Sequence, residues 1–120
     1  MAIKSYRDLE VWQVGMELVT DIYRITESFP TYERFLLTTQ LRRAGVSIVS
    51  NIAEGNARAT RGEYRHFVSI ASGSAVEVEV QLEVAERLGY TDAETLAAAR
   101  ERCESIGRML TKLKRALAPK

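Results

Sequence analysis

Apolar side chains recur every three or four residues over most of the chain, which is the period of an amphipathic α-helix. The period breaks at three stretches, "SFPTYE", "RATRGE" and "LGYTDAE". These breaks predict four helices, at about residues 8–28, 33–57, 62–88 and 92–117. Each helix would be about 30 to 40 Å long at a rise of ~1.5 Å per residue.

Residues with known helix-end preferences support these boundaries. Pro30 disfavours a helical conformation at the residue before it. Thr60 precedes a glutamate by three residues, which is the spacing of a capping box. Gly89 suits a helix C-cap, and Thr91 or Asp92 suits the next N-cap. Short loops between similar helices favour antiparallel neighbours, so the sequence predicts an all-α, up-down-up-down four-helix bundle in which the whole chain forms one domain.

Two of the predicted helices have more apolar surface than one bundle core needs. The helix at 8–28 has one stripe through Leu9, Trp12, Met16, Val19 and Tyr23, and a second through Val11, Val14, Leu18, Ile22 and Ile25. The helix at 62–88 has a stripe from Tyr64 to Ala85 and, on another face, a line through Gly73, Val76, Val80 and Val84. Periodicity leaves open which stripe faces the core.

A second apolar stripe would lie in water unless another chain covers it, and such patches usually mark interfaces. We therefore expect a homo-oligomer. The alternative is that the valines lie under a loop or at the flank of a wide core. The candidate interface residues are Val76, Val80, Val84, Val11, Leu18 and Ile22.

The segment "VSIVSNIAEGNAR" places polar residues among apolar ones on the second predicted helix. On a helical wheel its polar residues form one narrow stripe, and a comparable polar flank runs along the third helix. We predict that the two stripes form a buried structural seam, within one protomer or between protomers, and not an active site. In this seam Arg43 and Arg58 would pair with Glu54 and Glu77. Buried polar groups need such partners. The predicted seam consists of Arg43, Ser47, Ser50, Asn51, Glu54, Ser74, Glu77 and Gln81.

Three stretches, "DLEVWQ", "FPTYERFLLTTQLRRAGVSIVSNIAEGNAR" and "EYRHFVSIASGSAVEVEVQLEVAERLGY", resemble the family of 23S rRNA intervening-sequence proteins. The pattern Q-L-R-R-A-x-x-S-I-x-x-N-I-A-E-G carries most of the resemblance, which spans about residues 8 to 90. Val49 departs from the family, which often has proline there, so this helix is expected to be straighter. The last predicted helix matches only as a generic amphipathic helix.

The resemblance implies a left-handed four-helix bundle that assembles as a homopentameric ring. The family is also similar to the accessory variability proteins of diversity-generating retroelements, which are pentamers that bind nucleic acid and a reverse transcriptase. The family's name records where some of its genes lie and implies no biochemical activity. It implies no catalytic residues either.

Charge is uneven along the chain although the total is only +1. Residues 31–61 and 91–120 each sum to +3, whereas residues 1–30 sum to −2 and 62–90 to −3. Repeated around a ring, the basic helices would form a surface for phosphate groups. The alternative is a solvated face paired with Glu101, Glu104 or the acidic third helix. The candidate nucleic-acid-binding residues are Arg42, Arg58, Arg61, Arg100, Arg108, Lys112, Lys114 and Arg115.

The sequence offers little for catalysis, and we expect neither enzyme activity, nor a metal, nor a cofactor. Glu63 and His66 have the Glu-x-x-His spacing of di-iron bundles, but that motif is needed twice and occurs once. Cys103 is the only cysteine, which excludes an internal disulfide and suits a reducing compartment. It falls on the apolar stripe of the last helix, so we expect a core residue.

The N-terminal sequence has no apolar signal region and no apolar run is long enough to span a membrane, so we expect a cytoplasmic protein. The first hypothesis is a non-enzymatic oligomeric accessory protein that binds RNA or DNA mainly through phosphates, alongside a reverse transcriptase or another protein. The second hypothesis is a protein-interaction scaffold with no nucleic-acid role.

Overall fold

The computed structural model describes residues 4–119. Within them lie the helices α1 (Glu10–Thr26), α2 (Leu37–Asn56), α3 (Arg61–Arg87) and α4 (Ala93–Ala116), and the short 3-10 helices η1 (Tyr6–Asp8) and η2 (Thr31–Glu33). None of the helices in this part of the chain is long and apolar enough to cross a lipid bilayer.

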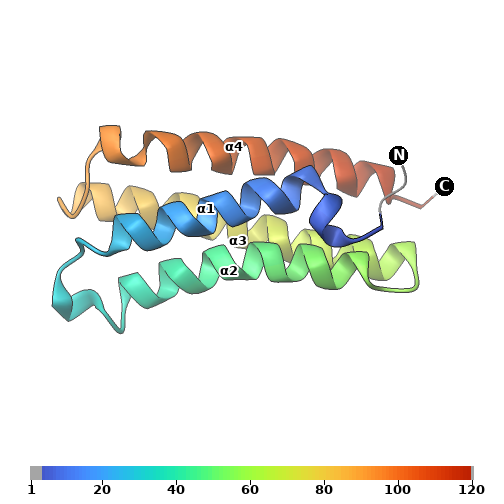
Figure 1. Cartoon of the computed structure of the whole chain (residues 1–120), viewed down its shortest axis with the longest axis horizontal. Coiled ribbons are helices and arrows are strands. Elements are labelled where there is room, and N and C mark those ends of the chain that lie inside the picture. The colour runs from blue at the N-terminus through green and yellow to red at the C-terminus, as the bar shows by residue number, and fades with distance from the viewer. Residues whose placement is uncertain (1–3, 120) are drawn as a thin grey trace.

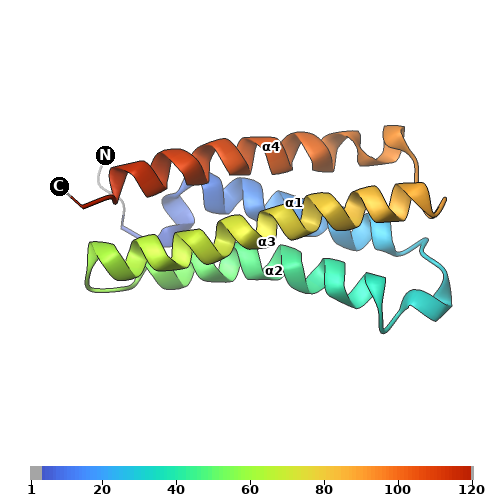
Figure 2. The same ribbon diagram turned by 180° about the vertical axis from the view of Figure 1, so that it is seen from behind.

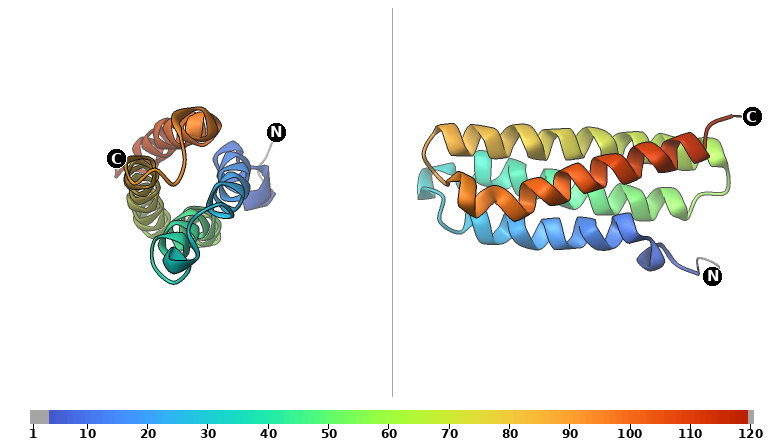
Figure 3. Two further views of the ribbon diagram at one scale, coloured as in Figure 1. Left: turned by 90° about the vertical axis from the view of Figure 1, so that its left-hand side faces the viewer. Right: turned by 90° about the horizontal axis from the view of Figure 1, so that it is seen from above.

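The four helices form an elongated antiparallel bundle with principal extents of 47 × 25 × 23 Å. Each helix packs against the next in sequence, and α4 packs back against α1. Viewed from the end, the helices occupy the corners of a rough square (Figure 3). Successive helices run in opposite directions, so both termini lie at the same end as the α2–α3 connection (Figures 1 and 2). The prediction of an all-α, up-down bundle is confirmed.

Most of the predicted helix ends agree with the structure because local capping chemistry determines them. The Thr60 hydroxyl accepts a hydrogen bond from the Glu63 backbone N–H at 3.1 Å, and the Asp92 carboxylate accepts one from the Thr95 N–H at 2.8 Å. Gly89 follows α3 with a φ of +79°, a left-handed conformation that glycine adopts without steric cost.

Two predicted helix starts were wrong. Residues 6–8 form η1, and extended backbone at Leu9 (φ −74°, ψ 125°) separates it from α1. The second helix begins at Leu37 and not near residue 33, because the preceding segment forms η2 and a turn. The Tyr90 hydroxyl donates a 2.7 Å hydrogen bond to the Glu33 carboxylate, which ties this segment to the α3–α4 connection. A contact between residues far apart in the sequence thus holds the η2 segment outside α2.

The structure settles which stripe of α1 faces the core. Leu18 and Ile22 are fully buried, and Val11 is 6% exposed. In the other stripe Met16 and Tyr23 are 40% and 42% exposed, whereas Leu9 and Trp12 are partly buried against the edge of the core. The assignment of Val11, Leu18 and Ile22 to an oligomer interface was therefore wrong, because their side chains are packed inside the protomer's own core.

Helix α2 approaches both neighbours closely because it carries glycine at the contact points. A Cβ built on Gly45 would lie 2.7 Å from the Cδ1 atom of Ile22 on α1. A Cβ built on Gly55 would lie 2.8 Å from the Cβ of Phe67 and 3.0 Å from a ring carbon of Tyr64, both on α3. At Gly55 the obstructing Phe67 atom is bonded to the backbone of α3, so it cannot move without the helix.

We predict that Gly55→Ala lowers the free energy of unfolding by ~1–3 kcal/mol, since overpacking forces the two helices apart. The matched control is Gly107→Ala in α4, where a Cβ meets no atom within 4 Å. That substitution should stabilise the helix by ~0.5–1 kcal/mol. Urea unfolding at one fixed protein concentration compares the two variants. Equal effects of the two substitutions would contradict the tight α2–α3 contact.

Candidate nucleic-acid interface

The antiparallel topology gathers basic side chains at one end of the bundle. Three segments meet at this basic end: residues 4–10, 54–66 and 108–119. They carry nine Lys and Arg residues but only four carboxylates. The rest of the described chain carries seven Lys and Arg residues and twelve carboxylates. The nine basic residues are Lys4, Arg7, Arg58, Arg61, Arg65, Arg108, Lys112, Lys114 and Arg115. The protein therefore has a positive end and a negative remainder.

The positive charges of the basic end are largely uncompensated. Of its nine basic residues, only Arg58 forms an ion pair within residues 4–119, with Glu54 at 2.6 Å. Arg108, Lys112 and Arg115 are exposed on the outer face of α4, opposite the buried stripe of that helix. The alternative that Glu101 and Glu104 neutralise this face is not seen in the described part of the chain, where neither carboxylate forms an ion pair with it.

Two of the candidate binding residues lie away from the basic end. Arg100 pairs with Glu86 at 2.7 Å and with Glu83 at 3.5 Å, and the hydrogen bond that its guanidinium donates to Glu86 raises the pKa of Arg100. Arg42 donates a 2.9 Å hydrogen bond to the Thr26 hydroxyl. Arg100 lies about 20 Å along α4 from Arg115. These two arginines therefore do not belong to the same surface as the other six candidates.

The sequence reasoning missed Arg65 because it lies on the net acidic third helix. In the structure the Nε atom of Arg65 donates to the backbone oxygen of Lys114 at 3.3 Å, and Arg61 donates to the oxygen of Ala116 at 2.5 Å. Both oxygens belong to the last turn of α4, whose carbonyls have no partners within the helix. Only the packing of α3 beside α4 reveals this role, since the two segments are about fifty residues apart.

Part of the predicted polar seam lies between α2 and α3 as expected. Ser74 is buried, and its hydroxyl is 2.8 Å from the hydroxyl of Ser47. The Asn51 amide donates to both the backbone oxygen and the hydroxyl of Ser47, at 2.8 and 3.0 Å. A small hydrogen-bonded cluster of three side chains thus joins the two helices.

The predicted ion pairs of the seam form only in part. Arg58 pairs with Glu54, but Arg58 lies just beyond the end of α2, and the pair is exposed and does not bridge α2 and α3. Arg43 and Glu77 line the same shallow polar pocket but form no ion pair within residues 4–119. The seam therefore extends from a buried centre into solvent, where long charged side chains remain hydrated. The other exposed or half-buried members are Ser50 and Gln81.

We predict that Asn51→Leu destabilises the fold by ~1–2 kcal/mol, because it removes two donated hydrogen bonds and leaves Ser47 without that partner. Glu54→Leu should change stability by no more than ~0.5 kcal/mol, since its ion pair is exposed. Chemical denaturation of both variants measures the difference. A larger loss for Glu54→Leu than for Asn51→Leu would refute the assignment of the seam's centre.

His66 is exposed on α3, whereas Cys103 lies in the core of the bundle. Within residues 4–119 no group of three or more His, Cys, Asp or Glu side chains is placed to hold a metal ion. Cys103 is fully buried in the core, as predicted. Burial raises the pKa of its thiol to about 12, and Glu79 and Asp21 act in the same direction. The thiol is therefore protonated at neutral pH and serves as a small core side chain.

These features define a small all-α protein whose candidate site is a charged surface at the end of a four-helix bundle. The profile of the 23S rRNA-intervening sequence protein family matches residues 7–112, so the chain belongs to that family. The match includes most of α4, which the sequence motifs alone did not connect with the family. The recognition of the family from the motifs of the first three helices is confirmed.

Among solved structures with a similar fold is one with a TM-score of 0.78 and 24% sequence identity, covering 87% of this chain and 97% of the other. It is a protein from Bacteroides thetaiotaomicron, described as having unknown function and belonging to the S23 ribosomal protein family. At this identity the likeness shows the fold alone. No curated protein matches the chain.

Proposed function

We propose that the protein is a non-enzymatic, homo-oligomeric accessory protein that binds RNA or DNA through the basic end of its bundle. The observation that carries this proposal is the excess of nine basic residues over four carboxylates at that end. When uncompensated Lys and Arg side chains contact the phosphates of a nucleic acid, they displace the counterions condensed on it, and this release favours binding. Because the contacts are mainly with phosphates, sequence preference should be weak.

Oligomerisation would multiply this basic surface. The outer face of α3 exposes an apolar stripe, which includes Val76 at 57%, Val80 at 55% and Val84 at 39% exposure. A closed ring needs two different complementary patches on each copy. The outward residues Met16, Tyr23 and Val46, each about 40% exposed, supply a second apolar patch across α1 and α2. In a cyclic assembly, such as the expected pentamer, every copy presents its basic end on the same side, so binding becomes multivalent.

Replacing Arg108, Lys112 and Arg115 with Gln should weaken binding and reduce the slope of log affinity against log salt by about three units. Fluorescence anisotropy of nuclease-free protein with labelled RNA and DNA over a salt series measures both quantities. The matched control replaces Arg24, Arg34 and Arg87, three exposed arginines far from the basic end, and removes the same charge. An equal loss of affinity in the control variant would show that binding depends only on the net charge of the protein and not on the basic end. Absence of binding at low salt by intact oligomer would refute the proposal.

Val80→Glu should dissociate the oligomer, because it puts a charge at the centre of the exposed stripe on α3. Light scattering coupled to gel filtration measures the mass of the assembly. Ala97→Glu adds the same charge at an exposed position on α4 and should leave the mass unchanged. A monomeric wild-type protein, or an unchanged Val80→Glu oligomer, would contradict this interface.

A second candidate function is a protein-interaction scaffold, for a reverse transcriptase or another protein. The connection between α1 and α2 favours it, because Phe35 is 83%, Tyr32 72% and Leu36 58% exposed. Exposed aromatic side chains are typical anchors of protein interfaces. The salt series separates the two functions, since a largely apolar contact depends little on ionic strength.

A further inference from the structure

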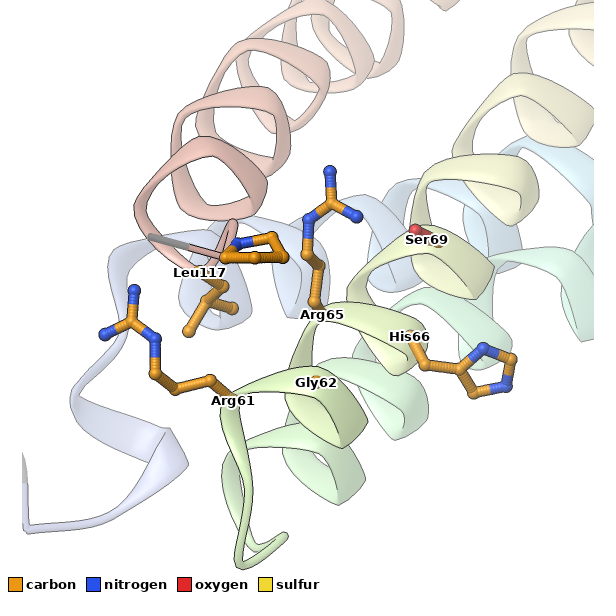
Figure 4. A pocket seen from close by; sticks show the side chains of 7 residues that line it. Arg61, Gly62, Arg65, His66, Ser69 and Leu117 are labelled. Carbon is orange, nitrogen blue, oxygen red and sulfur yellow. The ribbon is translucent and has the colours of Figure 1, made fainter.

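The basic end contains a pocket next to the exposed cations of α4. It is about 730 Å³ in volume and lies between the first three turns of α3 and the end of α4 (Figure 4). No carboxylate lines it. Its lining residues are Arg61, Gly62, Arg65, His66, Ser69, Leu117 and Pro119.

The two arginines of this pocket are held in place by the protein itself. Arg61 and Arg65 rise from consecutive turns of α3 on either side of Leu117 (Figure 4). Each donates one hydrogen bond to a backbone oxygen of α4, and these two oxygens, on Lys114 and Ala116, are two residues apart. Most of the N–H donors of each guanidinium therefore remain available while the side chains stay close together. Such preorganisation lowers the entropy cost of binding an anion.

The chemistry of the pocket matches a phosphomonoester better than the phosphodiester of a continuous strand. A phosphomonoester carries about two negative charges near neutral pH, which two guanidinium groups neutralise, whereas a diester carries about one. Leu117 and Pro119 add an apolar wall beside the arginines. An apolar wall suits the sugar or base attached to the phosphate. His66 lines the same pocket, but its ring points away from the arginines (Figure 4).

We propose that this pocket binds the phosphorylated end of a nucleic-acid strand, with Arg61 and Arg65 contacting the terminal phosphate. The proposal rests on the proposed nucleic-acid function and adds a preference for strand ends. Phosphorylated oligonucleotides bind more tightly than the same oligonucleotides with hydroxyl ends, and the difference originates in this pocket.

The first test compares short single-stranded RNA and DNA oligonucleotides that carry a 5′-phosphate, a 3′-phosphate or hydroxyl groups at both ends. We expect about a tenfold tighter binding for one phosphorylated form, the effect of one additional charge-assisted contact. Equal affinity for all three forms overturns the pocket proposal and leaves the proposed function standing. Absence of binding by every oligonucleotide overturns both.

The second test places a negative charge in the pocket without removing the arginine contacts to α4. A Cβ on Gly62 meets no atom within 4 Å, so Gly62→Glu fits the structure, and Gly62→Gln is the neutral control of the same size. Gly62→Glu should abolish the preference for phosphorylated ends, while Gly62→Gln retains it. Arg108→Gln, outside the pocket, should weaken binding of all oligonucleotides and also retain the preference. A preference that survives Gly62→Glu overturns the proposal.

The third test separates the possible sources of the phosphate. His66 is the only histidine, so its ring signals in an NMR spectrum need no assignment by mutation. Titration with a phosphorylated oligonucleotide should shift these signals at lower concentration than titration with a nucleoside monophosphate, inorganic phosphate or a phosphopeptide. If one of these small ligands or the phosphopeptide binds as tightly as the oligonucleotide, the strand end is not the ligand of this pocket and the proposal is wrong.

Discussion

The close approach of α2 to its neighbours is the constraint on which the rest of the bundle depends. At Gly55 the absence of a side chain lets α2 reach α3 at the Cβ of Phe67, and at Gly45 it lets α2 reach the side chain of Ile22 on α1. Helices that pack this closely bring short polar side chains within hydrogen-bond distance. The 2.8 Å contact between the hydroxyls of Ser47 and Ser74 follows from that geometry. The mixed polar and apolar character of α2 therefore suits a helix that packs closely against two neighbours. Its small polar residues are hydrogen-bonded in the middle of the α2–α3 contact, and its charged residues lie at the edge of that contact, in solvent.

The same antiparallel arrangement produces the candidate site. The basic residues that follow α2, begin α3 and end α4 are separated by long stretches of sequence, but these segments meet at one end of the bundle. Acidic residues concentrate on the opposite portion, where they pair with Arg100 and Arg102. Arg102 on α4 forms ion pairs with Glu17 and Asp21 on α1, so the charge of this arginine is compensated within the bundle. The basic end lacks comparable pairs, which leaves its charge available to a ligand.

Arg61 and Arg65 combine a structural role with the proposed binding role. Their guanidinium groups donate hydrogen bonds to two backbone carbonyl oxygens at the end of α4, which have no donor within the helix. The same contacts fix the guanidinium groups at the edge of a pocket. A side chain that stabilises the fold and remains partly available for a ligand needs little reorganisation when the ligand binds.

The sequence by itself determined the class of fold, most helix ends and the family. The helical period reflects burial of one face, and Thr60, Gly89 and Asp92 act through local hydrogen bonds or local backbone conformation, so neighbouring residues are sufficient to predict them. The residues of the basic end were partly predictable for the same reason, since Arg108, Lys112 and Arg115 share one face of a single helix.

Only the tertiary structure decided which of two apolar stripes on α1 is buried, because both have the same period and differ only in what packs against them. The tertiary structure also places Arg42 and Arg100 away from the basic end, and it brings Arg65 into hydrogen-bond contact with α4. It likewise determines that α2 begins at Leu37 and not near residue 33. Each of these outcomes depends on a contact between residues far apart in the chain, and helical periodicity contains no information about such contacts.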